Sequence, residues 1–112
     1  MSVQAPGRKL GIDVRHDSNG TTVLLSGPLL VRDANEVRRK LDAVVDRSPS
    51  SLMLDLASVT SLDVAGLAAV TAPALRVRRA AGDVMIVPPT NAEACRLVRR
   101  VGVVPVMNQL RR

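Results

Sequence analysis

The chain has 112 residues, of which 46% are hydrophobic and none is Phe, Tyr or Trp, a composition that predicts one folded domain with an aliphatic core and excludes a disordered chain. The 16 Lys and Arg against 10 Asp and Glu give a formal net charge of +6. The arginines accompany apolar stripes, so we interpret them as solvated helix faces, and we expect no specific nucleic-acid binding. Without aromatic rings the chain also lacks the stacking surfaces of single-strand binders, whereas an acidic protein partner stays open.

The cysteine content and the chain start bear on location. Cys95 is the only cysteine, which excludes an intramolecular disulfide and a zinc cluster and suits a reducing compartment. The first residues contain no apolar segment of signal-peptide length, and no apolar run approaches the roughly 20 residues of a membrane-spanning helix. We therefore expect a cytoplasmic protein without membrane insertion, with a flexible tail over residues 1–9 and one domain over residues 10–112.

The first predicted elements are two strands. Residues 10–17 alternate apolar and polar side chains, the period of a half-buried strand. Asn19-Gly20 is a two-residue hairpin signal, so residues 21–27 are expected to form an antiparallel partner strand that ends at Gly27-Pro28.

A helix and a central strand are predicted next. Asp33 is the expected N-cap, with Glu36 three residues later, and the apolar side chains that follow recur at helical spacing: Val37, Leu41, Val44 and Val45. Residues 51–57 are dense in apolar side chains and predict a central strand that is covered on at least one face.

A second helix is expected from Val64 to about Ala81, with Asp63 as its cap and Gly82 just after its end. Pro73 lies inside this stretch. Because proline lacks an N–H and its ring clashes with the preceding turn, we expect a kink or a break near Thr71 and Ala72.

The last elements are a strand, a helix and an edge strand. Residues 83–88 predict the strand, and Thr90 with Glu93 forms a capping box for a helix with an apolar stripe at Ala94, Leu97, Val98 and Val101. Residues 103–107 predict a short edge strand, where Pro105 is tolerated. The alternation of strands and helices predicts an α/β fold with a mixed sheet of four or five strands, parallel in its second part.

The sequence offers no pattern for catalysis, a metal or a cofactor. The seven glycines never take a phosphate-loop spacing, and no nucleophile stands with a base. His16 is interpreted as a surface residue and Cys95 as a buried structural thiol. Asp55 and Asp63 are interpreted as braces of their loops rather than as a general acid and base. We therefore expect a protein that is not an enzyme.

The corner from Asp63 to Gly66 is the sharpest feature. An aspartate here can accept hydrogen bonds from the free N–H groups of the first helical turn, where the helix dipole favours a negative charge. Loops at this side of an α/β sheet commonly carry function. Taken alone, the corner is equally consistent with a plain helix cap and with a binding surface.

The stretch LMLDLASVTSLDVAGLAAV resembles the central motif of the STAS domain, which occurs in anti-sigma factor antagonists and in sulphate transporter tails. LLSGPLLVRDANEVRRKL is similar to the Gly-Glu-Leu-Asp loop and first helix of that family, and AGDVMIVPPTNAEACRLVRRVGV is similar to its later strand and helix. The resemblance implies a mixed four- to five-stranded sheet with three to four helices, mainly on one face. It also implies an anti-sigma factor as the partner, and the serine-kinase type of anti-sigma factor is one option.

The departures from the family pattern change the expected regulation. The serine that is phosphorylated in regulatory members corresponds to Val64, and the next serine corresponds to Ala65, so no hydroxyl remains there. Both carboxylates of the Gly-Glu-Leu-Asp loop are lost. Ser61 and Thr60 are kept open as substitute phosphorylation positions.

The resemblance therefore implies an anti-sigma factor antagonist that works without phosphorylation at Val64. The alternative is a stand-alone STAS regulatory subunit of a membrane transporter, and an inactive paralogue and a homodimer also stay open. The expected partner-binding residues lie in the loop after the second strand and at the start of the second helix: Leu30, Val31, Arg32, Asp33, Asp63, Val64, Ala65, Gly66 and Leu67.

Overall fold

A computed structural model describes residues 9–18, 20–101 and 108–109. Residues 1–8 of the predicted tail and the strand predicted at 103–107 lie outside the described residues. The strands are β1 Gly11–Asp17, β2 Gly20–Leu29, β3 Ser51–Leu62, β4 Asp83–Val87 and β5 Asn108–Gln109. The helices are the 3₁₀ turn η1 Val31–Asp33, α1 Ala34–Asp46, α2 Val64–Arg79 and α3 Ala92–Val101.

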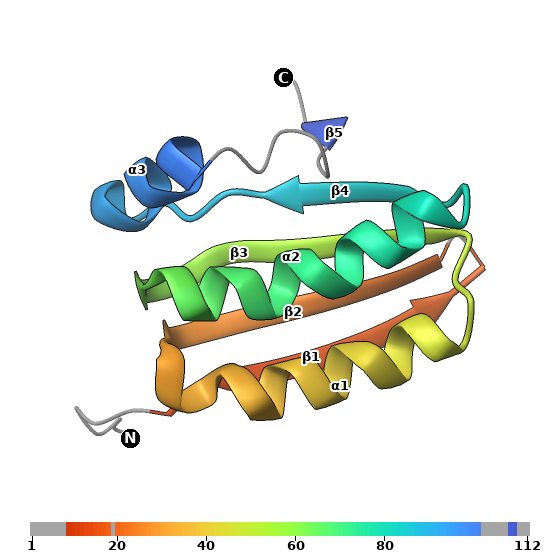
Figure 1. The fold of residues 1–112 in the computed structure, drawn as a ribbon, viewed down its shortest axis with the longest axis horizontal. Helices are drawn as coiled ribbons and strands as arrows, with labels where there is room; N and C mark the ends of the chain where they lie inside the picture. Colours follow the sequence, from red (N-terminus) through yellow and green to blue (C-terminus); the bar gives the residue numbers. More distant parts are fainter. Residues whose placement is uncertain (1–8, 19, 102–107, 110–112) are drawn as a thin grey trace.

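The five strands form one sheet in the order β1-β2-β3-β4-β5 (Figure 1). β1 pairs antiparallel with β2, and β2, β3, β4 and β5 run parallel. The mixed α/β fold predicted from the alternating patterns is confirmed, including the hairpin and the parallel section.

The core lies between the sheet and two helices. Figure 1 shows α1 and α2 side by side across one face of the sheet. The apolar stripe predicted for α1 is buried, and on β3 every second residue from Leu52 to Leu56 points into the same core. Aliphatic side chains alone fill this core, as the composition requires.

β2 is longer than predicted, because it continues through Gly27 and Pro28 to Leu29. β1 pairs with β2 only as far as Ser26; beyond that point β3 is the only strand that pairs with β2 among the described residues, and the register with β3 shifts between Gly27 and Pro28. A proline is tolerated at such an edge position with a bulge, because no ladder bond requires its N–H.

The break predicted in the second helix is wrong: α2 runs without interruption from Val64 to Arg79, with Pro73 inside it. Pro73 has no N–H to donate to the preceding turn, but buried residues on both sides of it, among them Val70 and Val77, hold the helix on the sheet. Tertiary packing therefore outweighs the local cost.

α2 ends in a Schellman motif. The N–H of Gly82 donates to the carbonyl of Val77 at 2.8 Å, and the N–H of Ala81 donates to the carbonyl of Arg78 at 3.0 Å. The left-handed position is Ala81, with φ of 69°, and not Gly82. Gly82 is required for a different reason: a Cβ there would lie 2.7 Å from Cγ1 of Val77.

The cap of α3 also differs from the prediction. Asn91, and not Thr90, accepts the hydrogen bond of the first helical turn, from the N–H of Ala94 at 3.0 Å. Thr90 instead donates its hydroxyl to the carbonyl of Ala57 at 3.0 Å, which ties the start of α3 to β3.

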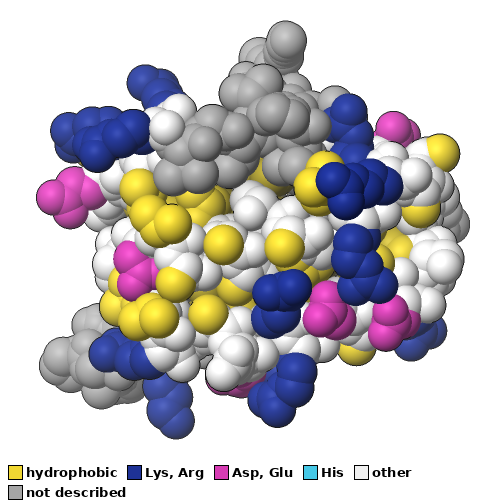
Figure 2. Space-filling model, viewed as in Figure 1, with side chains coloured by type: hydrophobic (Ala, Val, Ile, Leu, Met, Phe, Trp, Pro, Cys, Tyr) yellow, Lys and Arg dark blue, Asp and Glu magenta, His cyan; other side chains and the backbone are white. Residues whose placement is uncertain are grey.

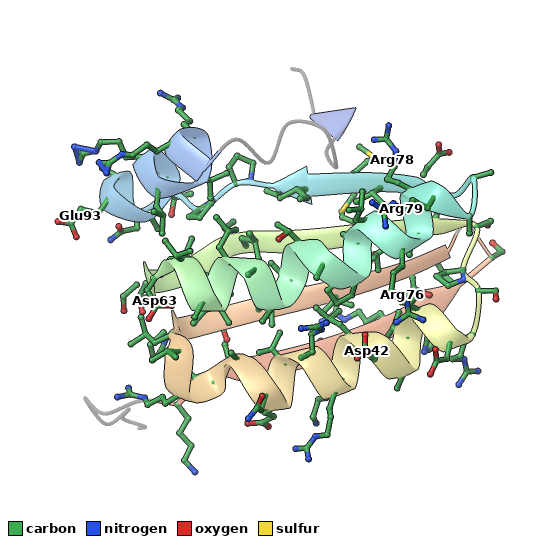
Figure 3. All side chains as sticks on the ribbon, in the orientation of Figure 1. Asp42, Asp63, Arg76, Arg78, Arg79 and Glu93 are labelled. Atoms are coloured by element: carbon green, nitrogen blue, oxygen red, sulfur yellow. The ribbon has the colours of Figure 1, made fainter. Side chains whose placement is uncertain are left out.

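At the end of the molecule where α2 finishes, Arg76 joins the two core helices. Its guanidinium donates to Asp42 at 3.0 Å and to Asp46 at 3.2 Å, both on α1 (Figure 3). Arg76 thus lies on an exposed helix surface, as we interpreted the arginines from the sequence.

Candidate functional site

The candidate site lies where β2 and β3 end. Leu29, the last residue of β2, pairs with Leu62, the last residue of β3, so the segments that follow leave the sheet side by side. The first leads into η1 and the second leads through Asp63 into α2 (Figure 1). The two segments that the sequence singled out, 30–33 and 63–67, are therefore brought together.

Asp63 holds these two segments with both carboxylate oxygens. Oδ1 accepts a hydrogen bond from the N–H of Gly66 at 2.8 Å, which is the predicted N-cap of α2. Oδ2 accepts one from the N–H of Val31 at 2.9 Å, across 32 positions of the chain. The negative charge of Asp63 is therefore bound by two backbone N–H groups of the protein itself, and it holds the two segments together.

Gly66 allows α2 to begin directly against β2. A Cβ at this position would lie 2.1 Å from the carbonyl oxygen of Leu29 and 2.7 Å from its carbonyl carbon. No side chain can occupy that space, so α2 can begin this close to the sheet only because residue 66 is glycine.

Val31 and Val64 are the exposed part of the site. Val31 is 66% exposed and Val64 is 60% exposed. Among the described residues, they are the only large hydrophobic residues that are exposed. Asp63 connects them, because it binds the N–H of Val31 and immediately precedes Val64. Figure 2 shows hydrophobic side chains gathered at this end of the molecule and along α2.

A second aspartate, Asp33, stabilises the η1 turn beside this apolar surface. Asp33 precedes α1 but makes no side-chain cap bond to it. Its Oδ2 accepts a hydrogen bond from the N–H of Leu30 at 3.0 Å and so closes the η1 turn. Asp33 is therefore the N-cap residue of α1, as predicted, but its side chain does not cap the helix, because the carboxylate binds the N–H of Leu30 instead.

The predicted partner-binding residues divide into two groups. Val31, Arg32 and Val64 are exposed, with Leu30, Asp33, Asp63 and Ala65 half-buried beside them. Gly66 and Leu67 are buried, so they are not part of the exposed surface. Thr60 and Ser61 are both exposed.

A groove of about 400 Å³ borders the site, and it was not predicted from the sequence. It lies between the end of β3 and α3 and is lined by Leu62, Glu93, Arg96, Leu97 and Arg100. The helical spacing of Arg96 and Arg100 was visible in the sequence, but their position next to Leu62 depends on how α3 packs.

The other polar candidates remain apart from this site. Asp55 accepts a hydrogen bond from the N–H of Ala57 at 3.0 Å, and the Nδ1 of His16 lies 3.1 Å from the Oγ1 of Thr21. Cys95 is half-buried and not fully buried as predicted. Within the described residues, no group of three or more His, Cys, Asp or Glu side chains is placed to bind a metal ion.

None of the described helices is long and apolar enough to cross a lipid bilayer.

Comparison with protein families gives a match of residues 12–105 to the family "Mlab, STAS domain". A comparison with curated proteins found no significant sequence match.

Solved structures share the fold at low sequence identity. An anti-sigma factor antagonist from Mycobacterium paratuberculosis superposes with a TM-score of 0.82 at 22% identity, over 98% of this chain and 92% of that one. The anti-sigma factor antagonist SpoIIAA in its unphosphorylated form gives 0.65 at 14% identity, over 91% and 89%. The Bacillus cell fate determinant SpoIIAA in the phosphorylated form gives 0.65 at 14% identity, over 90% and 92%.

Proposed function

Because the chain belongs to the STAS domain family, we propose that it is an anti-sigma factor antagonist, which binds an anti-sigma factor and so frees a sigma factor for transcription. The proposal places this protein in the cytoplasm and gives it no catalytic role. The fold that it shares with anti-sigma factor antagonists supports this reading.

The observation that carries the proposal is the pair of exposed valines on a rigid support. Val31 and Val64 come from segments that are far apart in the chain, and the carboxylate of Asp63 fixes the two segments together. Exposed apolar side chains on a preorganised surface favour binding of a protein, because little order has to be created on association.

In this proposal the complex is independent of phosphorylation at position 64, since a valine cannot accept a phosphoryl group. The exposed hydroxyls of Ser61 and Thr60 offer the competing reading. They precede the cap, however, and so they do not occupy the helix start where the family carries its serine.

The direct test uses this protein and each anti-sigma factor of its host, purified separately. We expect one of them to bind, and its sigma factor to be released when this protein is added, as measured by calorimetry and by size-exclusion chromatography. With ATP present, the complex should persist and this protein should stay unlabelled. Phosphate mapped to Ser61 or Thr60 would refute regulation-free binding, and absence of binding to every anti-sigma factor would refute the function.

Substitutions at Val64 test the surface itself. Val64→Asp should weaken the complex at least tenfold, because it brings a charge into an apolar contact. Val64→Ser should change the free energy of unfolding by no more than about 0.5 kcal/mol, since the side chain is exposed. Ser50→Asp introduces the same charge at an exposed position before β3, at the opposite end of the strand, and should leave binding unchanged.

A second candidate is a STAS regulatory subunit of a membrane transporter. The observation in its favour is the exposed Val64, because a permanently apolar position suits a constitutive assembly better than a reversible switch. Affinity purification from the native host distinguishes the two: an anti-sigma factor in the soluble fraction supports the first function, and a transporter subunit in detergent-solubilised membranes supports the second.

A further inference from the structure

β1 forms one edge of the described sheet. It pairs with β2 on one side and with no other described strand. All seven of its residues align with β2 without a register shift, from Gly11 opposite Ser26 to Asp17 opposite Gly20. The strand contains no proline and no bulge, so its outer edge offers a regular row of backbone groups to a further strand.

The charges on β1 are arranged symmetrically about Val14. Asp13 and Arg15 flank it, both are exposed, and their side chains meet at 2.9 Å on the face of the sheet opposite the core. If a second copy pairs antiparallel with Val14 opposite Val14, then Asp13 of each copy lies opposite Arg15 of the other. Two pairs of opposite charge then face each other across the new ladder.

Neighbouring registers lack this complementarity. A pairing centred on Asp13 places two aspartates opposite each other, and a pairing centred on Arg15 places two arginines opposite each other and also pairs Asp13 with Asp17. Like charges directly opposite destabilise an antiparallel pair. A pairing centred on His16 also sets Arg15 opposite Asp17, but it joins only residues 15–17 of the strand. Charge and full overlap of the two strands together therefore select the register centred on Val14.

The core side of β1 supports the same pairing. Ile12 and Val14 lie opposite Leu25 and Val23 of β2 and are packed against the core, yet both remain half-buried. A second β1 beside them would cover part of this remaining apolar surface, because residues that face each other across a ladder point to the same face of the sheet.

We propose that two copies of this chain associate through antiparallel pairing of their β1 strands, with Val14 at the two-fold axis, to form one sheet that is continuous across the dimer. No residue of β1 belongs to the surface around Val31 and Val64. The dimer is therefore independent of the proposed function, and either can fail without the other.

Sedimentation equilibrium of the full chain tests the proposal through a charge exchange. The wild type should show a concentration-dependent dimer. Arg15→Asp and Asp13→Arg each turn both cross-strand pairs repulsive and should raise the dissociation constant about tenfold or more. The double variant Asp13→Arg with Arg15→Asp restores opposite charges and should restore the dimer, while circular dichroism monitors the fold of every variant.

Cross-linking tests the register. Val14→Cys in a Cys95→Ala background places two thiols directly opposite each other, at a Cα separation of roughly 4.5–5.5 Å that a disulfide accepts. Oxidation should give a covalent dimer, whereas Val31→Cys in the same background, exposed at the other site, should stay monomeric. A monomeric wild type at all concentrations, or a dimer that is unchanged by both single charge reversals, would overturn the proposal.

Discussion

The two ends of α2 are held to the rest of the fold in different ways, and the difference leaves one end apolar and the other charged. At the first end, Asp63 binds the N–H groups of Gly66 and Val31, so the polar groups are satisfied internally and Val64 is left exposed. At the other end, Arg76 reaches across the surface to two aspartates of α1. An end where a carboxylate is bound by backbone N–H groups and two valines stay exposed offers an apolar surface for association, whereas the other end exposes charged side chains that already pair with one another.

The largest effect is expected at Gly66, where the first turn of α2 lies directly against the backbone of β2. Gly66→Ala would place a methyl group against the Leu29 carbonyl, which is backbone and cannot turn away, so we expect a loss of about 3 kcal/mol in the free energy of unfolding. Urea denaturation measures it. Ala68→Gly, an exposed position on the same helix, should cost only about 1 kcal/mol. Equal losses for the two variants would contradict the packing requirement at Gly66.

The next test removes the carboxylate that joins the two segments. Asp63→Ala should destabilise the protein by about 2 kcal/mol, because it loses the helix cap and a second charge-assisted hydrogen bond. Asp63→Asn keeps one acceptor for Gly66 but not the second oxygen for Val31, so it should recover about half of that loss, measured by the same denaturation. If the asparagine variant is no more stable than the alanine variant, the cap contributes nothing.

At the opposite end a single substitution should stabilise the protein. Ala81 adopts φ of 69°, a conformation that glycine occupies without strain, so Ala81→Gly should raise the free energy of unfolding by about 1 kcal/mol. The neighbouring Ala80 has φ of −91° and gives a matched control, because glycine gains nothing there. Thermal unfolding should show a higher Tm for the first variant and no increase for the second; the reverse order would refute the left-handed strain.

The smallest effect concerns the ion pairs of Arg76. These side chains are half exposed, so Arg76→Ala should cost about 0.5 kcal/mol at low salt and less in concentrated salt, where the charges are screened. Arg79→Ala is the control, since Arg79 forms no ion pair within the described residues. A loss that persists in concentrated salt would point to packing of the arginine stem.

The sequence was sufficient where local pattern decides the structure. The stripe of α1, the hairpin of β1 and β2, and the cap at Asp63 all follow from the spacing of neighbouring residues, and the structure confirms each. Other predictions fail where a distant contact outweighs the local signal. Thr90 has the properties of a cap but bonds to Ala57, which leaves Asn91 to cap α3.

Pro28 and the bond between Asp63 and Val31 show the same limit. Pro28 lies in β2 beyond the last pairing with β1 and opposite Ser61 of β3, an arrangement that the residues next to the proline do not encode. The carboxylate of Asp63 reaches a segment 32 positions earlier, and no periodicity carries that information. The candidate site could thus be located from the sequence, but the contact that holds its two halves together could not.

That long-range hydrogen bond also bears on the order of folding. The hairpin of β1 and β2 forms from residues close in the chain, whereas β2 and β3 pair in parallel only after the crossover through α1 has closed a long loop. Asp63 can bind Val31 only once both strands have reached their final register at Leu29 and Leu62. The apolar surface around Val64 therefore requires β2 and β3 to be paired, and we expect a chain in which these strands have not yet met to lack it.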